Sequence, residues 1–333
     1  MPCMSAPATP LSILDLAIIG KGETAADALR GSVLLAQRAE QRGYRRVWYA
    51  EHHNMSVIAS SAPAVLIAHV AAHTRTIRLG SGGVMLPNHS PLAIAEQFGT
   101  LATLHPGRID LGLGRAPGGD APTYRALRRD PRAAESFPGD VLELQGYLSG
   151  NSRVPGVVAT PGAGTNVPLY ILGSSLDGAR LAAAFGLPYG FASHFAPASL
   201  KQAVALYRSS FQPSAALSRP YVIAGVNVLA ADVEADALQQ LRIVLRARVA
   251  LLLGGGRTFT DDEADAIVRS PQGAFVADMM HYAAVGTPDR VAAYLKSFAA
   301  HADADELILA HGAPTVDERL RSVDLTADVW GMA

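Results

Sequence analysis

Short apolar runs rich in β-branched residues alternate with longer helical patterns along this chain. The helical patterns carry apolar residues three and four positions apart, whereas the short runs have the length and composition of buried strands. One helical pattern, over residues 24–42, ends at Gly43, a residue type that commonly terminates helices. Continuous alternation predicts a parallel sheet, because parallel neighbours need a crossover connection that a helix provides. The predicted strands cover residues 11–19, 45–50, 77–86, 108–114, 169–172, 189–192, 221–229 and 306–310.

Eight strand–helix units favour a closed (β/α)8 barrel, or TIM barrel, over an open doubly wound sheet. The glycine-rich GxGxxG motif does not follow the first predicted strand, which argues against a dinucleotide-binding fold. Segment 150–167 is rich in Gly and Pro, but the alternation resumes directly after it, so we interpret it as an insertion. The prediction is therefore one α/β barrel domain over residues 1–333, with its functional residues on the loops after the strand C-termini.

Composition narrows the functional classes. Hydrophobic residues make up 49% of the 333 residues and charged residues 17%, which supports a large buried core. The formal net charge of −1 lacks the basic excess of a nucleic-acid binder, so a small-molecule ligand is favoured. One cysteine, Cys3, cannot form an internal disulfide or a thiolate metal cluster. We expect a cytoplasmic protein without membrane contact, since the sequence shows neither a signal peptide nor an apolar run of bilayer length.

Two adjacent histidines and a carboxylate follow the second predicted strand, as Glu51, His52 and His53. A histidine at the mouth of a barrel can act as a base or a hydrogen-bond donor near neutral pH, and a neighbouring carboxylate can set its tautomer. A shared metal is disfavoured, because adjacent side chains of an extended segment point to opposite sides. The alternative is a pair of polar loop residues without a role in chemistry.

Three further strand ends carry residues suited to a ligand. Gly82 and Gly83 allow close approach of the backbone, or a tight bend. Arg115 suits a phosphate or carboxylate, or a salt bridge to a neighbouring loop. Ser174 and Ser175 precede a predicted helix whose first N–H groups can hold a phosphate; alternatively, Ser175 only caps that helix.

Two other segments bear on the predicted pocket. His194 and Phe195 end the sixth predicted strand and either line the pocket or cover it. Residues 254–284 show no clear periodicity and are predicted to be a mobile lid, with functionless disorder as the alternative.

Together these motifs resemble the bacterial-luciferase-like, flavin-dependent monooxygenases, and the resemblance extends over nearly the whole chain. It depends on the order of the motifs and on their placement at successive strand ends. The matching segments are WYAEHH at 48–53, LGSGGVMLPNHSP at 79–91, AEQFGTLATLHPGRIDLGLGR at 95–115, LGSS at 172–175, FGLPYGFASHF at 185–195 and VGTPDRV at 285–291.

The resemblance implies that reduced FMN, supplied by a separate NAD(P)H:flavin reductase, reacts with molecular oxygen to oxidise an unidentified small organic substrate. It assigns the catalytic role to His52, next to Glu51, and a non-proline cis peptide that supports the flavin ring to Gly82–Gly83. It also identifies 254–284 with a mobile loop that shields the site from water. The residues that it places around the FMN phosphate are Arg115, Ser174, Ser175 and Gly178.

The chain departs from the luciferases themselves at two positions. Gly114 replaces a reactive cysteine, and Gly178 replaces a hydroxylated residue near the phosphate. Light emission is therefore not implied. Two alternatives remain open: an oxidoreductase that uses the deazaflavin F420 on the same barrel, and a non-catalytic flavin-binding protein. We also expect a homodimer, with the alanine-rich helix predicted over 62–73 as one possible contact face.

Overall fold

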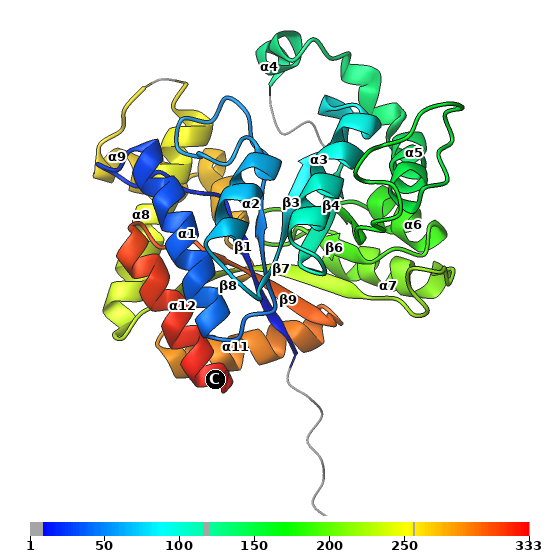
Figure 1. Ribbon diagram of the computed structural model, residues 1–333. Helices are drawn as coiled ribbons and strands as arrows, with labels where there is room; N and C mark the ends of the chain where they lie inside the picture. Colours follow the sequence, from blue (N-terminus) through cyan, green and yellow to red (C-terminus); the bar gives the residue numbers. More distant parts are fainter. Residues whose placement is uncertain (1–8, 116–119, 256, 333) are drawn as a thin grey trace, which may run out of the picture.

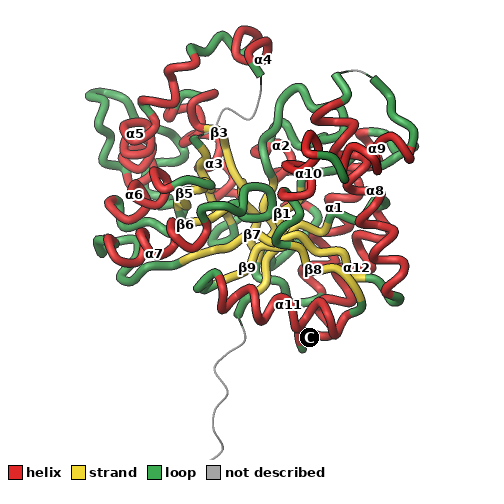
Figure 2. The backbone as a smooth tube through the Cα atoms, turned by 180° about the vertical axis from the view of Figure 1, so that it is seen from behind, coloured by secondary structure: helices red, strands yellow, loops and turns green. Residues whose placement is uncertain are grey.

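The computed structural model of the protein describes residues 9–115, 120–255 and 257–332; Cys3 lies outside them. Eight parallel strands close into a ring in which β1 pairs with both β2 and β9, and β6 pairs with β7. The predicted (β/α)8 barrel is thus confirmed, and Figures 1 and 2 show the helices surrounding the central strands. The ring consists of β1 (Leu11–Asp15), β2 (Arg46–Tyr49), β3 (Arg78–Met85), β4 (Ile109–Gly114), β5 (Leu169–Gly173), β6 (Tyr189–Phe191), β7 (Val222–Ala230) and β9 (Glu306–His311).

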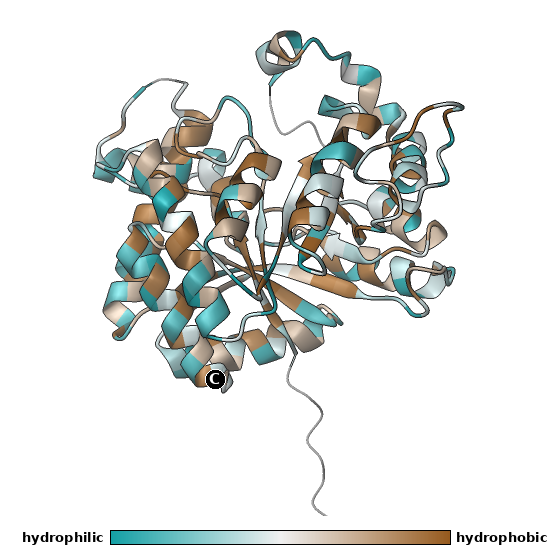
Figure 3. Cartoon of the chain, in the orientation of Figure 1, coloured by the Kyte–Doolittle hydropathy of each residue, from teal (hydrophilic) through white to brown (hydrophobic). Residues whose placement is uncertain are grey.

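Threonine residues cap the N-termini of two outer helices, α1 and α12. In α1 and α12, the threonine side chain accepts a hydrogen bond from the N–H three residues on, and the acidic side chain at that position accepts one from the threonine N–H. In Figure 3 hydrophobic residues gather on the central strands and hydrophilic residues on the outer helix faces. The surrounding helices are α1 (Ala25–Gln41), α2 (Pro63–Ala72), α3 (Pro91–Leu104), α5 (Phe137–Ser149), α6 (Leu176–Ala184), α7 (Leu200–Ser210), α8 (Glu234–Leu253), α11 (Pro288–His301) and α12 (Val316–Trp330).

Segment 254–284 differs from the irregular stretch expected there. It contains the helices α9 (Asp261–Val268) and α10 (Ala274–Asp278), and it ends in a ninth strand, β8 (Ala283–Gly286). Asn227 of β7 pairs with β8 and β9 at once, so β8 lies on the edge of β7 opposite β9. On this edge of β7, the three-residue β6 pairs only as far as Ala224, and β8 pairs with the residues beyond it. Another short helix, α4 (Ala121–Ala126), follows β4, and Figure 1 shows it standing away from the barrel.

A buried ionic network fills the N-terminal end of the barrel. The Arg46 side chain is 2% exposed and lies between the fully buried carboxylates of Asp110 and Glu306, at 2.7 and 2.9 Å. Its guanidinium also donates to the Tyr170 hydroxyl, at 2.7 Å. Above it, apolar side chains occupy the interior; they are Leu14, Trp48, Ala50, Tyr170, Ile223 and Ile308. The barrel is therefore sealed at this end, and any ligand site belongs to the opposite mouth.

Within the described residues, no helix is both long enough and apolar enough to cross a membrane.

Candidate active site

A cavity of about 1850 Å³ opens at the C-terminal ends of the strands. Ten of the predicted site residues line it, although they come from five different strand ends; Glu51 is the exception. The ten are His52, His53, Gly82, Gly83, Arg115, Ser174, Ser175, Gly178, His194 and Phe195. The barrel thus brings together residues up to 143 positions apart in the sequence, as the strand-end argument predicted.

Glu51 lies fully buried beneath the cavity and orders its floor. One of its oxygens accepts a hydrogen bond from the Met85 N–H at 3.0 Å. Its carboxylate also lies 2.9 Å from the Nε2 atoms of both His53 and His89. Burial raises the pKa of Glu51, but the bonds from His89, His53 and Met85 outweigh it and hold the pKa below its usual value. Glu51 is therefore an ionised anchor.

Of the two adjacent histidines, His52 is not the one that Glu51 contacts. Glu51 bonds to His53 instead, because adjacent residues of the extended segment point to opposite sides. The backbone N–H of His52 donates to the Ser60 carbonyl at 3.0 Å, which fixes the main chain at this point. The Nδ1 atom of His52 is buried without a hydrogen-bond partner in the described structure, and its ring lines the cavity.

The His52 ring is neutral at physiological pH. Burial lowers its pKa below 6.5, and the attraction of Glu51 offsets this only in part. Because Nδ1 is enclosed, Nε2 is the nitrogen that can serve a ligand. A neutral imidazole in this position can accept a proton or, in the other tautomer, donate one at Nε2.

His194 forms the neighbouring wall together with Asn227 and Arg248. Burial, with smaller contributions from Arg248 and His52, lowers the pKa of His194 to about 3. The Asn227 amide donates to the His194 carbonyl at 2.6 Å and so fixes this loop to β7. Phe195 packs edge-on against the His194 ring, at 5.2 Å between ring centroids, and remains 45% exposed at the rim. No sequence motif marks Asn227 or Arg248 as site residues.

The Gly82–Gly83 peptide bond is cis, as the family resemblance implied. The pairing register of β3 with β4 also shifts between Ser81 and Val84, so a bulge is present as well. Gly114, at the end of β4, lies close to Met85: a Cβ atom at position 114 would come within 2.8 Å of the Met85 sulfur. The methionine therefore occupies the space that a cysteine at position 114 would need.

The turn between β5 and α6 presents free backbone donors to the cavity. Ser175 is the N-cap of α6, yet its side chain makes no capping hydrogen bond, so the interpretation of Ser175 as merely a cap is wrong. The first N–H groups of a helix lack intrahelical partners and favour an anion. Gly178 contributes only backbone here, and its missing Cβ would lie 3.5 Å from the Tyr189 ring.

Arg115 reaches the same helix end from the loop after β4. Its guanidinium lies 3.4 Å from the Asp177 carboxylate, and both side chains are about half exposed. The salt bridge considered for Arg115 is thus present, but an exposed pair at this distance contributes about 0–1 kcal/mol. Such a pair leaves the arginine available to a stronger anion.

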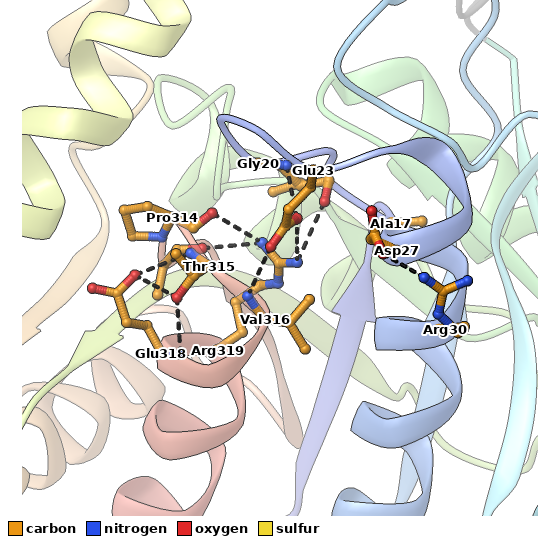
Figure 4. Close-up of polar contacts among 12 residues, drawn as sticks. Ala17, Gly20, Glu23, Asp27, Arg30, Pro314, Thr315, Val316, Glu318 and Arg319 are labelled. Atoms are coloured by element: carbon orange, nitrogen blue, oxygen red, sulfur yellow. Dashed lines mark hydrogen bonds and ion pairs between the residues drawn. The ribbon is translucent and has the colours of Figure 1, made fainter.

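The loop after β1 and the start of α12 both line the cavity, and Figure 4 shows the polar contacts between them. Arg319 of α12 donates to the carbonyls of Ile18 and Ala313, at 3.3 and 3.2 Å, and lies 3.7 Å from Glu23. Glu23 in turn accepts from the Gly20 N–H at 2.9 Å. Arg319 therefore joins the start of α12 to the loop after β1 at the rim of the cavity.

A metal centre finds no support in the part of the chain that the structure describes, where no group of three His, Cys, Asp or Glu side chains is arranged to hold an ion.

Solved structures with this fold include enzymes with different cofactors. An FMN complex of the oxygenating constituent of a Baeyer–Villiger monooxygenase from Pseudomonas putida superposes with a TM-score of 0.72; its identity is 16%, and the match covers 96% of this chain and 97% of that one. An F420-dependent secondary alcohol dehydrogenase gives a TM-score of 0.67 at 16% identity, covering 97% and 98%. At these identities the likeness shows the fold alone.

Closer relatives define the family. Residues 10–304 match the luciferase-like monooxygenase family. A luciferase-like monooxygenase of Escherichia coli (strain K12) is 47% identical over 321 residues, which cover 96% of each chain. The crystal structure of apo-MsnO8 has a TM-score of 0.87 at 34% identity and covers 98% of this chain and 99% of its own. The chain therefore belongs to the luciferase-like monooxygenase family.

Proposed function

We propose that the protein is a flavin-dependent monooxygenase that uses reduced FMN and molecular oxygen to oxidise a small organic substrate. One observation carries the proposal: a neutral, cavity-facing His52 and the uncapped N-terminus of α6 open into the same cavity. The first suits proton transfer at a reacting centre, and the second suits a phosphate.

The residues present fit FMN at both of its ends. Ser174, Ser175 and the backbone at Gly178 would hold the phosphate, with Arg115 released from Asp177 to join them. The Gly82–Gly83 backbone, which also lines the cavity, would support the ring. Reduced FMN, when bound, supplies the electrons that activate oxygen. A separate NAD(P)H:flavin reductase would provide it in a cytoplasmic setting.

The chain itself would position groups and exclude water. Glu51 holds His53 and the Met85 backbone in place, and His52 would hold or move a proton at Nε2. The segment 254–284 contributes Met279 to the cavity wall and would act as the lid that keeps water out.

F420 is the second candidate cofactor, since fold neighbours use it. Its anionic tail favours a basic rim, but Arg115 and Arg180 at this rim share the acidic Asp177. We therefore expect equilibrium titration to show tight binding of FMN and weak binding of F420. Tight F420 binding without FMN binding would reverse the choice. A complex in which reduced FMN decays as fast as in buffer would support a non-catalytic flavin-binding protein.

Replacing Ser175 with alanine separates phosphate binding from helix capping. Loss of a hydrogen bond to a charged group raises the Kd for FMN about ten-fold or more. The free energy of unfolding should change by less than about 0.5 kcal/mol, although a working N-cap contributes about 1 kcal/mol, because Ser175 makes no capping bond. Calorimetric titration and urea unfolding measure the two effects. A loss of stability with unchanged FMN affinity would contradict the assignment.

We further propose that α2 contributes to a homodimer. The exposed residues of α2 are Val65, Ala68, His69 and Ala72, and Val65 is 71% exposed. Light scattering at micromolar concentration should give a dimer for the wild type and a monomer for Val65→Glu, since a buried unpaired charge is costly. A wild-type monomer would refute the proposal, and a dimeric Val65→Glu protein would place the interface elsewhere.

A further inference from the structure

One arginine of the cavity wall lacks an acidic partner among the described residues. Arg248 of α8 donates to the carbonyl of Met279 and to the side-chain oxygen of Asn227, both at 3.3 Å. These two acceptors are neutral, and both bonds are long for N–H···O contacts. Burial lowers the pKa of Arg248 to about 10, so it remains charged at neutral pH. The cavity wall thus contains a positive charge, on Arg248, that no carboxylate among the described residues compensates.

The other arginines that line the cavity each have a carboxylate partner. Arg115 and Arg180 share Asp177, Arg246 binds Asp261 and Asp265, and Arg319 lies beside Glu23. Their charges serve the rim and the packing of α8 on α9. Among the cavity-lining arginines in the described residues, Arg248 therefore stands apart as a cation without a carboxylate.

Its position separates Arg248 from the proposed phosphate site. The proposed phosphate donors follow β4 and β5, whereas Arg248 follows β7, which lies two strands beyond β5 around the barrel. Asn227 accepts a hydrogen bond from Arg248 and donates one to the His194 carbonyl, which places Arg248 near His194. Around Arg248 the wall is mainly apolar, with Val244, Leu251 and Met279. A ligand bound there would contact one cationic side chain surrounded by mainly apolar side chains.

We propose that Arg248 binds the carboxylate of the substrate, which makes the substrate an organic acid with an apolar body. The planar guanidinium fork matches a carboxylate and still has N–H groups beyond the two that bind Met279 and Asn227. This inference rests on the proposed function and deepens it, because it names the class of substrate, held in the cavity that His52 also lines. The anion site itself does not depend on the cofactor.

Calorimetric titration with matched acid and amide pairs tests the site without turnover. The probes are hexanoate with hexanamide and benzoate with benzamide, added to the wild-type protein with and without FMN. In each pair the acid should bind on the order of ten-fold more tightly, since its bond to Arg248 is charge-assisted. Arg248→Met should abolish the difference and Arg248→Lys should retain part of it, because lysine keeps the charge but lacks the fork. Arg242→Met, at an exposed position of the same helix, should behave as the wild type.

The outcomes separate this inference from the proposed function. Equal binding of acids and amides by the wild type would overturn the anion site, whatever the variants do, so the test does not depend on their folding. If the wild type binds acids and amides equally and Arg248→Met weakens FMN binding ten-fold, Arg248 belongs to the cofactor site. This result would also overturn the anion site. The wild type could prefer acids, lose that preference in Arg248→Met, and yet fail to bind FMN. This result would support the anion site and refute the proposed function.

Discussion

Replacing His52 with alanine is expected to lower kcat by roughly 100- to 10,000-fold, the usual range for removal of a positioned acid or base. FMN affinity should change by less than about three-fold, because the proposed phosphate donors lie on α6 and the loop after β4. Stopped-flow absorbance of the reduced FMN complex mixed with oxygenated buffer would show how quickly the flavin returns to its oxidised spectrum. This return should be faster in the variant than in the wild type.

The pH profile gives an independent readout for His52. Its pKa is lowered mainly by burial, so the ring stays neutral as the pH falls through 6.5. A reaction that needs the neutral ring should keep its rate at pH 6.5 and lose it only at lower pH, and this acidic limb should vanish in His52→Ala. His105→Ala, outside the cavity, serves as the control. An unchanged flavin signal and an unchanged acidic limb in His52→Ala would remove His52 from the chemistry.

Arg46→Met is expected to lower the free energy of unfolding by about 3–5 kcal/mol, the usual effect of leaving buried charges without a partner. Asp110 and Glu306 are both fully buried, and the variant leaves two carboxylates beside one apolar side chain. Arg78 still reaches Asp110, and the Tyr221 hydroxyl still donates to Glu306 at 2.6 Å, but neither replaces the bridge between the acids. Urea unfolding would measure the loss.

Two comparisons make the Arg46 prediction specific. Arg246→Met breaks a more exposed pair of contacts, to Asp261 and Asp265, and should cost no more than about 1 kcal/mol. Adding Asp110→Asn and Glu306→Gln to Arg46→Met should recover part of the lost stability, because the buried negative charges disappear. Equal losses for Arg46→Met and Arg246→Met, or no recovery in the triple variant, would show that the network is held by packing instead.

The eight strands of the ring were predictable, whereas β8 was not. Strong local patterns mark the ring strands, and closing a barrel needs all eight. The sequence of β8, Ala-Ala-Val-Gly, carries little strand signal, and the strand forms because β6 is too short to cover the far half of β7. Helix α9 did carry a detectable signal: Thr260 and Glu263 form a capping box at its start.

The positions of the site residues at the barrel mouth were predictable from the sequence, but the hydrogen bonds and ion pairs among them were not. The strand ends placed His52, Gly82 and Ser174 at one mouth, because parallel strands share a carboxyl edge. The contact of Glu51 with His53 follows from the alternation of side chains along the extended segment, whereas no local pattern predicts its contact with His89, 38 residues away. No local pattern distinguishes Arg248 from Arg242 and Arg246 on the same helix.

By itself the sequence determined the alternation of strands and helices, the mouth at which the site forms and the family, since these depend on local periodicity, caps and ordered motifs. Only the tertiary structure decided which charges are neutralised. Arg46, Arg319 and Arg248 look alike in the chain, but the first meets two buried acids, the second binds the β1 loop, and the third meets neutral oxygens. The physical reason is that a charge is compensated by its neighbours in space, which barrel closure brings from distant parts of the chain.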